Sequence, residues 1–143
     1  MNVTRRGLLA VSALLAACGS RRQDMLPEKV GQPWRRTSLK NVAWSVAEAP
    51  LSEKVVRRIQ SATYEGPGKL EVKAYETTSA AVAFEAVQRW QRAEDKLLFN
   101  RDEHFIVVRF EKTEPKLLNN FARDLTSYLR PGQAAQTAPP STP

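Results

Sequence analysis

Three apolar side chains alternate with polar or aromatic ones in the segment 69–76, which is typical of a strand with one buried face. The apolar ones are Leu70, Val72 and Ala74. The similar segment 57–64 precedes it, and the residues between them, Glu65-Gly66-Pro67-Gly68, are those of a turn. The pattern predicts a β-hairpin.

Two later segments have the periodicity of amphipathic helices. The first begins at Thr78 or Ser79, either of which can cap it, and runs through Arg92. Its apolar stripe consists of Ala80, Phe84 with Ala83, Val87 and Trp90. The second helix begins near Glu114-Pro115, since proline is tolerated in a first turn. Its stripe consists of Leu118, Phe121, Leu125 and Leu129.

Between the predicted helices lies a second hairpin, formed by residues 96–100, a charged bend at 101–103 and residues 104–110. The order of elements is ββαββα. It predicts a small α+β domain with a four-stranded antiparallel sheet and two helices packed on one face.

The region 34–51 allows two interpretations. Val42, Trp44 and Val46 alternate as in a strand, so a fifth strand at one edge of the sheet is expected. An apolar flap agrees with the same residues.

The N-terminal segment has the pattern of a secretory signal peptide. A positively charged head with Arg5 and Arg6 precedes an apolar run from Gly7 to Ala17. In a helix, these eleven residues would reach about 16 Å, roughly half of a bilayer's hydrocarbon core. The run is therefore too short to span a membrane.

The sequence Leu15-Ala16-Ala17-Cys18 resembles the lipobox of bacterial lipoproteins. The resemblance implies cleavage between Ala17 and Cys18, a diacylglycerol on the Cys18 sulfur, and usually a third acyl chain on the new amino terminus. Two or three acyl chains hold a protein stably on a membrane, whereas one does so only marginally.

A second resemblance overlaps the first. Thr4-Arg5-Arg6-Gly7-Leu8-Leu9 is similar to the twin-arginine export motif, which implies export in the folded state. Paired arginines also occur in ordinary export signals, so both routes stay open. Gly19 and Ser20 directly follow Cys18, in place of the aspartate that retains some lipoproteins in the inner membrane, so an outer membrane is favoured if two membranes are present.

The sequence predicts four parts: a signal peptide at 1–17, a lipidated flexible tether at 18–33, a folded domain at 34–130, and a disordered tail rich in proline, alanine and threonine at 131–143. Removal of the signal lowers Lys plus Arg from 22 to 20 against 15 acidic residues, a net charge of +5. For an exported protein, this charge favours anionic lipids or envelope polymers as partners, and not nucleic acid.

Few residue types suited to catalysis or metal binding are present. The single cysteine is used for lipid and His104 is the single histidine, so we expect no disulfide, no metal site and no cofactor. There is no nucleophile elbow or phosphate loop, and no catalytic residue is assigned. His104 is the residue that an enzyme hypothesis would use, because the neighbouring carboxylates of Asp102 and Glu103 could raise its basicity.

A surface for a ligand or partner is predicted instead from aromatic residues and neighbouring arginines, which can stack on sugars or clamp anions. Its residues are Trp34, Arg35, Arg36, Trp44 and Tyr75.

The segment from Tyr64 to Val108 resembles a group of bacterial exported proteins through three features. These are a Tyr-x-Gly turn, a helix similar to residues 83–90 and a strand similar to residues 104–108. The group has no assigned activity, so the resemblance implies no functional residue.

Three functional hypotheses follow. The first is a non-enzymatic envelope lipoprotein, facing the periplasm or exterior, that binds an envelope protein or an anionic polymer. The second is a receptor or sensor for a small ligand, with a pocket lined by Trp34, Trp44 and Tyr75 and at least about 300 Å³ in volume. The third, an enzyme, requires a cleft that places His104 near a carboxylate and a hydroxyl.

Overall fold

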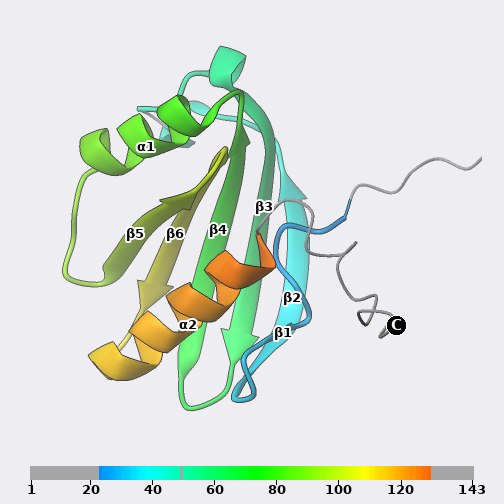
Figure 1. Ribbon diagram of the computed structural model, residues 1–143, viewed down its shortest axis with the longest axis vertical. Helices are drawn as coiled ribbons and strands as arrows, with labels where there is room; N and C mark the ends of the chain where they lie inside the picture. Colours follow the sequence, from blue (N-terminus) through cyan, green and yellow to red (C-terminus); the bar gives the residue numbers. More distant parts are fainter. Residues whose placement is uncertain (1–22, 49, 130–143) are drawn as a thin grey trace, which may run out of the picture.

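Six strands form one antiparallel sheet in the order β1-β2-β3-β4-β6-β5 (Figure 1). The computed structural model describes residues 23–48 and 50–129. The strands are β1 (Lys29–Val30), β2 (Trp34–Val42), β3 (Val56–Glu65), β4 (Lys69–Thr77), β5 (Lys96–Arg101) and β6 (His104–Phe110). The helices are α1 (Ala80–Arg89) and α2 (Pro115–Tyr128), with the short 3₁₀ turns η1 (Val46–Glu48) and η2 (Glu53–Val55).

Both predicted hairpins are present, as β3–β4 and β5–β6. The turn of the first requires a glycine at position 66, because a Cβ there would lie 2.1 Å from the backbone oxygen of Pro33. The α+β class is therefore confirmed, but the predicted number of strands is too low. Two further strands, β1 and β2, precede the hairpins.

The expected strand through Val42, Trp44 and Val46 is wrong in position. Strand β2 ends at Val42, which pairs with Ile59 of β3, and Val46 lies in η1 with 80% of its surface exposed. Strand β2 lies on the outer side of β3, and the two-residue strand β1 pairs only with its first residues, Trp34 and Arg35.

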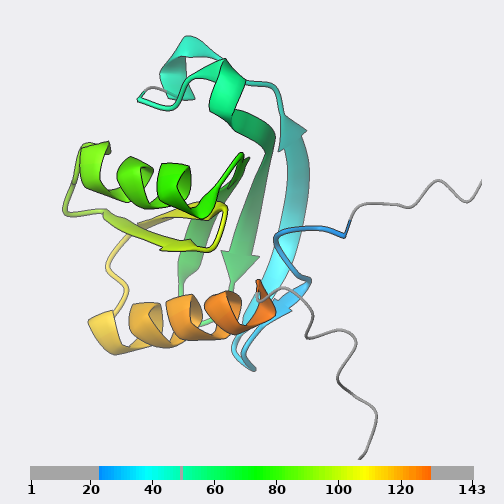
Figure 2. The ribbon, with the colours of Figure 1, turned by 45° about the horizontal axis from the view of Figure 1, so that its top comes forward.

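The two helices pack on opposite faces of the sheet, which corrects the prediction that they share one face. In β6, Ile106 and Val108 belong to the core under α2, whereas Phe105 and Val107 belong to the core under α1. Successive strand residues point to opposite faces, so the two helices must lie on different sides. Figure 2 shows the β5–β6 pair between them.

Each face therefore has its own apolar core. On the α2 face, the ring of Phe121 meets Trp34 and Tyr64 edge-on at centroid distances of 5.9 and 5.3 Å. On the α1 face, Tyr75 and Phe105 lie under the helix with ring centroids 5.5 Å apart.

Helix α1 begins as predicted, since Ser79 accepts a hydrogen bond from the backbone N–H of Val82 at 3.2 Å. It ends at Arg89, three residues before the predicted end. Its buried residues are Ala83 and Ala86, and Phe84, predicted to face the core, is 56% exposed. Small alanines let the helix lie close to the sheet, and the half-buried Trp90 fills the space beyond its last turn.

Helix α2 agrees with its predicted bounds and stripe. Pro115 is in its first turn. The residues Leu118, Phe121, Leu125 and Leu129 are all buried.

The segment 23–33 was predicted to be part of a flexible tether, and this is wrong. Met25, Leu26 and Val30 are at most 2% exposed and belong to the core of the α2 face. In Figure 1 the segment runs beside β2 and the end of α2. The segment from residue 23 onward therefore belongs to the folded domain.

Several predictions concern residues outside the described part of the chain. They are the signal peptide 1–17 with Arg5, Arg6 and Ala17, the lipidated Cys18, the first residues of the tether, and the tail 131–143. Within residues 23–48 and 50–129, no helix is long and apolar enough to cross a membrane.

Candidate binding site

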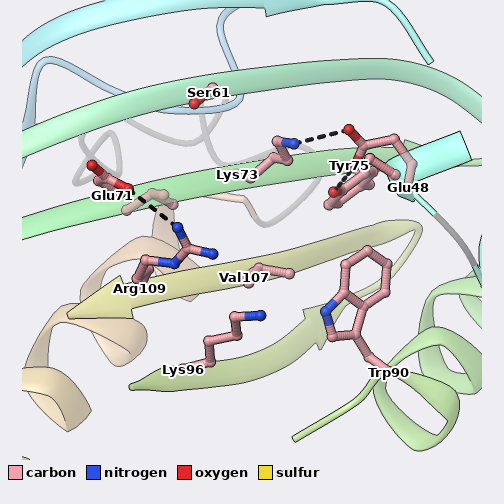
Figure 3. A pocket seen from close by; sticks show the side chains of 11 residues that line it. Glu48, Ser61, Glu71, Lys73, Tyr75, Trp90, Lys96, Val107 and Arg109 are labelled. Carbon is pink, nitrogen blue, oxygen red and sulfur yellow. Dashed lines mark hydrogen bonds and ion pairs between the residues drawn. The ribbon is translucent and has the colours of Figure 1, made fainter. Parts of the chain in front are cut away.

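A hollow of about 370 Å³ opens on the α1 face of the sheet, and we call this side the groove face (Figure 3). Its floor comes from neighbouring strands, and η1 and Trp90, the residue that follows α1, lie together at one end of it. Figure 3 labels nine of its lining residues: Glu48, Ser61, Glu71, Lys73, Tyr75, Trp90, Lys96, Val107 and Arg109.

The strand register arranges the groove face in rows that cross the sheet. Directly paired residues of antiparallel strands lie side by side on the same face. The row under α1 is mainly apolar: Val42, Ile59, Tyr75 and Phe105. The next row, which we call the near row, is Lys40, Ser61, Lys73, Val107 and Leu98. The far row is Ser38, Thr63, Glu71, Arg109 and Lys96.

The near and far rows contain four cations and one carboxylate, together with three hydroxyl groups. Successive rows on one face are about 7 Å apart, so the two rows form a continuous polar strip beyond the edge of α1. A second hollow of about 370 Å³ shares Glu71 and Arg109 with the first and continues to Lys69 and Glu111. The hollowed surface thus follows β4 along its length.

Glu48 closes one end of the hollow as a buried carboxylate that is only 3% exposed. Its Oε1 accepts a hydrogen bond from Lys73 Nζ at 2.9 Å, and its Oε2 accepts one from the Tyr75 hydroxyl. A buried charge is tolerated only when it is paired and hydrogen-bonded, and both donors come from β4. This arrangement fixes η1 on the sheet.

The Tyr75 hydroxyl is held in its protonated form. Burial, followed by the hydrogen bond to Glu48 and the charge of that carboxylate, raises the pKa of Tyr75 far above its usual value. The hydroxyl therefore acts as a donor to Glu48, and it is not a source of negative charge in the groove.

An aromatic wall stands beside this pair. Trp90 lies 5.7 Å from the ring of Tyr75 and 5.2 Å from that of Phe105, measured between centroids. Trp90 is half-buried and lines the hollow, so part of its ring is available to a ligand.

The cations at the other end are held weakly. Arg109 approaches Glu71 at 3.9 Å and Asp95 at 4.0 Å, and its side chain is 56% exposed. Exposed pairs of this kind contribute about 0–1 kcal/mol. In the described ranges, Lys40 and Lys96 have no carboxylate within 4.0 Å. These side chains are available to negatively charged groups of a ligand.

Most of the surface predicted from aromatic residues and arginines does not exist as one site. Trp34 is 1% exposed in the core of the α2 face, whereas Trp44 packs on the α1 face and donates from Nε1 to the Leu51 carbonyl at 3.0 Å. Arg36 donates to the Leu26 carbonyl at 2.5 Å, and Arg35 is exposed on β2. A pocket lined by Trp34, Trp44 and Tyr75 together is therefore excluded, because the sheet separates Trp34 from the other two.

Tyr75 is the one residue of that set that lines the groove. Its partners Glu48, Lys73, Lys96 and Arg109 were not in the predicted site. The alternation in 69–76 and 104–110 was the available signal, because it places Lys73 and Arg109 on the side away from the core of α2. Nothing in the sequence around Glu48 indicated its burial.

His104 lies outside the groove. It begins β6 after a turn in which Asp102 has φ 48°, and it pairs across the sheet with Glu76 and Arg101 on the opposite face. Its Nδ1 is buried without a hydrogen-bond partner. The enzyme hypothesis requires a carboxylate and a hydroxyl near His104. In the part of the chain that the structure describes, neither kind of group forms a hydrogen bond with this side chain.

No group of three His, Cys, Asp or Glu side chains suited to a metal ion occurs among residues 23–48 and 50–129. None of the protein-family models, curated proteins and solved structures compared with this chain matches it.

Proposed function

We propose that this chain is a bacterial envelope lipoprotein, anchored through lipid on Cys18, whose domain binds an anionic envelope polymer on its groove face. The lipobox residues that end at Cys18 support the anchor. In this role the protein is a binding module, faces the periplasm or exterior, and belongs to the outer membrane if two membranes are present.

The polar strip is the observation that carries the binding role. Lys40, Lys73, Lys96 and Arg109 lie in adjacent rows of one face, and Glu71 is the one carboxylate in these rows. Lys73 is paired with the buried Glu48, so Lys40, Lys96 and Arg109 are the cations that a ligand would meet. An extended ligand with carboxylate or phosphate groups at intervals would meet several cations at once. Hydroxyl groups of Ser38, Ser61 and Thr63 could contact its uncharged parts.

The hollow adds an aromatic side chain, Trp90, to one end of the polar strip. A ligand segment there would meet the exposed part of Trp90, and Lys96 and Arg109 line the same hollow. Indole surfaces stack well on sugar rings and apolar groups, while the two cations hold neighbouring anionic oxygens. The site therefore fits a polymer that carries both kinds of group.

The test is co-sedimentation of the domain with isolated cell-wall polymer at low and high ionic strength. The double variant Lys96→Glu with Arg109→Glu should bind about tenfold more weakly at low salt, and wild-type binding should weaken as salt rises. The matched control is Lys116→Glu with Arg123→Glu, which makes the same change in net charge on exposed positions of α2. This control should bind like the wild type.

Equal losses in both double variants would mean that net charge alone drives the association, and would contradict a site on the groove face. Binding that is unaffected by the Lys96 and Arg109 changes would do so as well. Crosslinking that captures an envelope protein on the groove face, with no polymer bound, would replace the polymer with a protein partner.

A receptor for a small anionic ligand is the second candidate, and the volume of the hollow favours it. Ligand pockets are commonly about 300–1,000 Å³, and this hollow reaches about 370 Å³. Its lining is more polar than that of a typical small-molecule site, so we rank it second. Calorimetric titration with small dicarboxylates and sugar phosphates would support it through saturable binding that Lys96→Glu abolishes.

A further inference from the structure

The chain is fixed to the domain from Gln23 onward. Tyr128 Oη donates to the Asp24 carbonyl at 2.9 Å and accepts from Gln23 Nε2 at 3.1 Å. Arg58 Nη2 donates to the Gln23 carbonyl at 3.0 Å. Both donors belong to regular elements, α2 and β3, so the position of Gln23 is set by the fold.

The residues after Gln23 strengthen this attachment. The backbone N–H of Met25 donates to Gln60 Oε1 at 2.8 Å, and the Tyr64 hydroxyl donates to the Pro27 carbonyl at 2.6 Å. The side chains of Met25 and Leu26 are 2% and 0% exposed. Burial of each large apolar side chain contributes about 1.5–3 kcal/mol, which opposes detachment of the segment.

This attachment limits the distance between the domain and its lipid. Cys18 and Gln23 are five residues apart in the sequence, and a fully extended chain spans at most about 3.6 Å per residue. The lipidated sulfur and the surface of the domain can therefore be separated by about 18 Å at most. A tether from 18 to 33 would have allowed about three times that distance.

The attachment also selects one side of the domain. Arg58, Gln60 and Tyr64 hold the segment, and they alternate along β3 with Ile59, Ser61 and Thr63, which belong to the groove face. Successive strand residues point to opposite faces, so Gln23 emerges on the α2 face. The sheet lies between the attachment point and the polar strip.

We infer that the domain is held against the lipid head groups by its α2 face, at the end of α2 near Tyr128, and that the groove face opens away from the bilayer. This inference rests on the lipid anchor at Cys18 proposed above. The short connection prevents the domain from turning the polar strip toward the membrane, so the strip stays available to polymer on the far side.

Two labelled variants test this orientation in vesicles of phosphatidylethanolamine and phosphatidylglycerol that carry a quencher on their head groups. Because Cys18 is the only cysteine and carries lipid, a cysteine introduced elsewhere is the single free thiol. Ser127→Cys places a fluorophore on the exposed side of α2, next to Tyr128, and Ser38→Cys places it on the groove face. Quenching at position 127 should exceed quenching at position 38 several-fold.

The control inserts about a dozen Gly and Ser residues between Arg22 and Gln23, which extends the reach of the connection several-fold without changing the domain. The difference between the two labels should then largely disappear. Metabolic lipid labelling and vesicle flotation are measured on every variant. Absence of acylation would contradict the proposed anchor, whereas acylated protein with equal quenching at both positions, or stronger quenching at position 38, would contradict the orientation alone.

Discussion

Glu48 and Tyr75 illustrate how single residues shape the groove. The carboxylate lies on a three-residue 3₁₀ turn that has little stability of its own, and two donors from β4 hold it in place. Removal of one donor leaves a buried charge with a single partner, which is strongly unfavourable. The wall of the hollow therefore depends on a polar contact as well as on apolar packing.

The buried tyrosines make stability fall at high pH. Burial raises the pKa of Tyr75 and of Tyr64 above the ordinary value of 10.0, so the unfolded chain releases these protons first. The contribution of each tyrosine hydroxyl to the free energy of unfolding is complete below pH 10. It decreases as the pH rises further, by about 1.4 kcal/mol per pH unit for each group.

Urea denaturation of the wild type and of Tyr75→Phe at several pH values measures this effect. Tyr75→Phe should be less stable near neutral pH, because Glu48 loses a donor. The difference in the free energy of unfolding between the two proteins should decrease as the pH rises above about 10, because the wild type loses the contribution of the hydroxyl. A difference in the free energy of unfolding that stays constant through about pH 11 would show that the Tyr75 hydroxyl has the same pKa in the folded and unfolded states.

For single residues, the sequence predicted the face of the sheet on which a side chain lies more reliably than it predicted which other side chains contact it. Alternation in 69–76 correctly separated Leu70 and Val72 from Lys73 and Tyr75. It could not tell that Tyr75 is also buried, since that depends on α1, η1 and Phe105 covering the second face. Trp34 beside two arginines suggested a ligand site, but contact with Phe121, far away in the sequence, places it in the core.

The elements that could be predicted are those with strong local signals. The turn sequence Glu65-Gly66-Pro67-Gly68, the Ser79 cap and the stripe of α2 can each be recognised from a few neighbouring residues. The side of α1 that faces the sheet was predicted incorrectly, because its alanines and its larger apolar residues lie on several sides of the helix and either set could form the buried side. Strand β2 was misplaced because most of its residues are polar, and its pairing with β3 depends on distant contacts.

The N-terminal segment 23–30 was missed for a related reason. Met25, Leu26 and Val30 have no regular period, and the surrounding residues are polar, which resembles a linker. Their burial depends on α2, which follows about ninety residues later in the sequence. A property of the whole fold thus decided the structure of a short segment.

Substitution in this segment distinguishes a structural element from a tether. Leu26→Ala should lower the free energy of unfolding by about 2–5 kcal/mol, because it leaves a cavity in the core of the α2 face. Lys29→Ala, at an exposed position of β1, should change it by less than about 0.5 kcal/mol. Urea denaturation of both variants provides the comparison, and a Leu26→Ala domain as stable as the wild type would mean that the segment contributes nothing to the fold.

For the whole molecule, the two proposed roles belong to opposite faces of one sheet. Gln23, the described residue that lies nearest in the sequence to the proposed lipid anchor, contacts Tyr128 on the α2 face, and the polar strip belongs to the α1 face. Neither assignment was accessible from the sequence, because the predicted fold had both helices on one side. In the predicted fold, the second face of the sheet carries no helix. Such a fold therefore has no hollow between the sheet and a helix on that face.

The proposed lipid anchor leads to a prediction for the chain with its N-terminal segment present. Cys18→Ala should abolish metabolic labelling with fatty acid, because the sulfur that receives the diacylglycerol is absent. The variant should accumulate as an uncleaved or soluble form, since cleavage before residue 18 depends on the lipidated cysteine. The domain itself should keep the wild-type thermal transition, because residues 23–48 and 50–129, which form the described fold, contain no cysteine. Lipid labelling that is unchanged in Cys18→Ala would contradict the anchor, whereas a variant that loses both lipid and fold would show that residues near Cys18 belong to the domain.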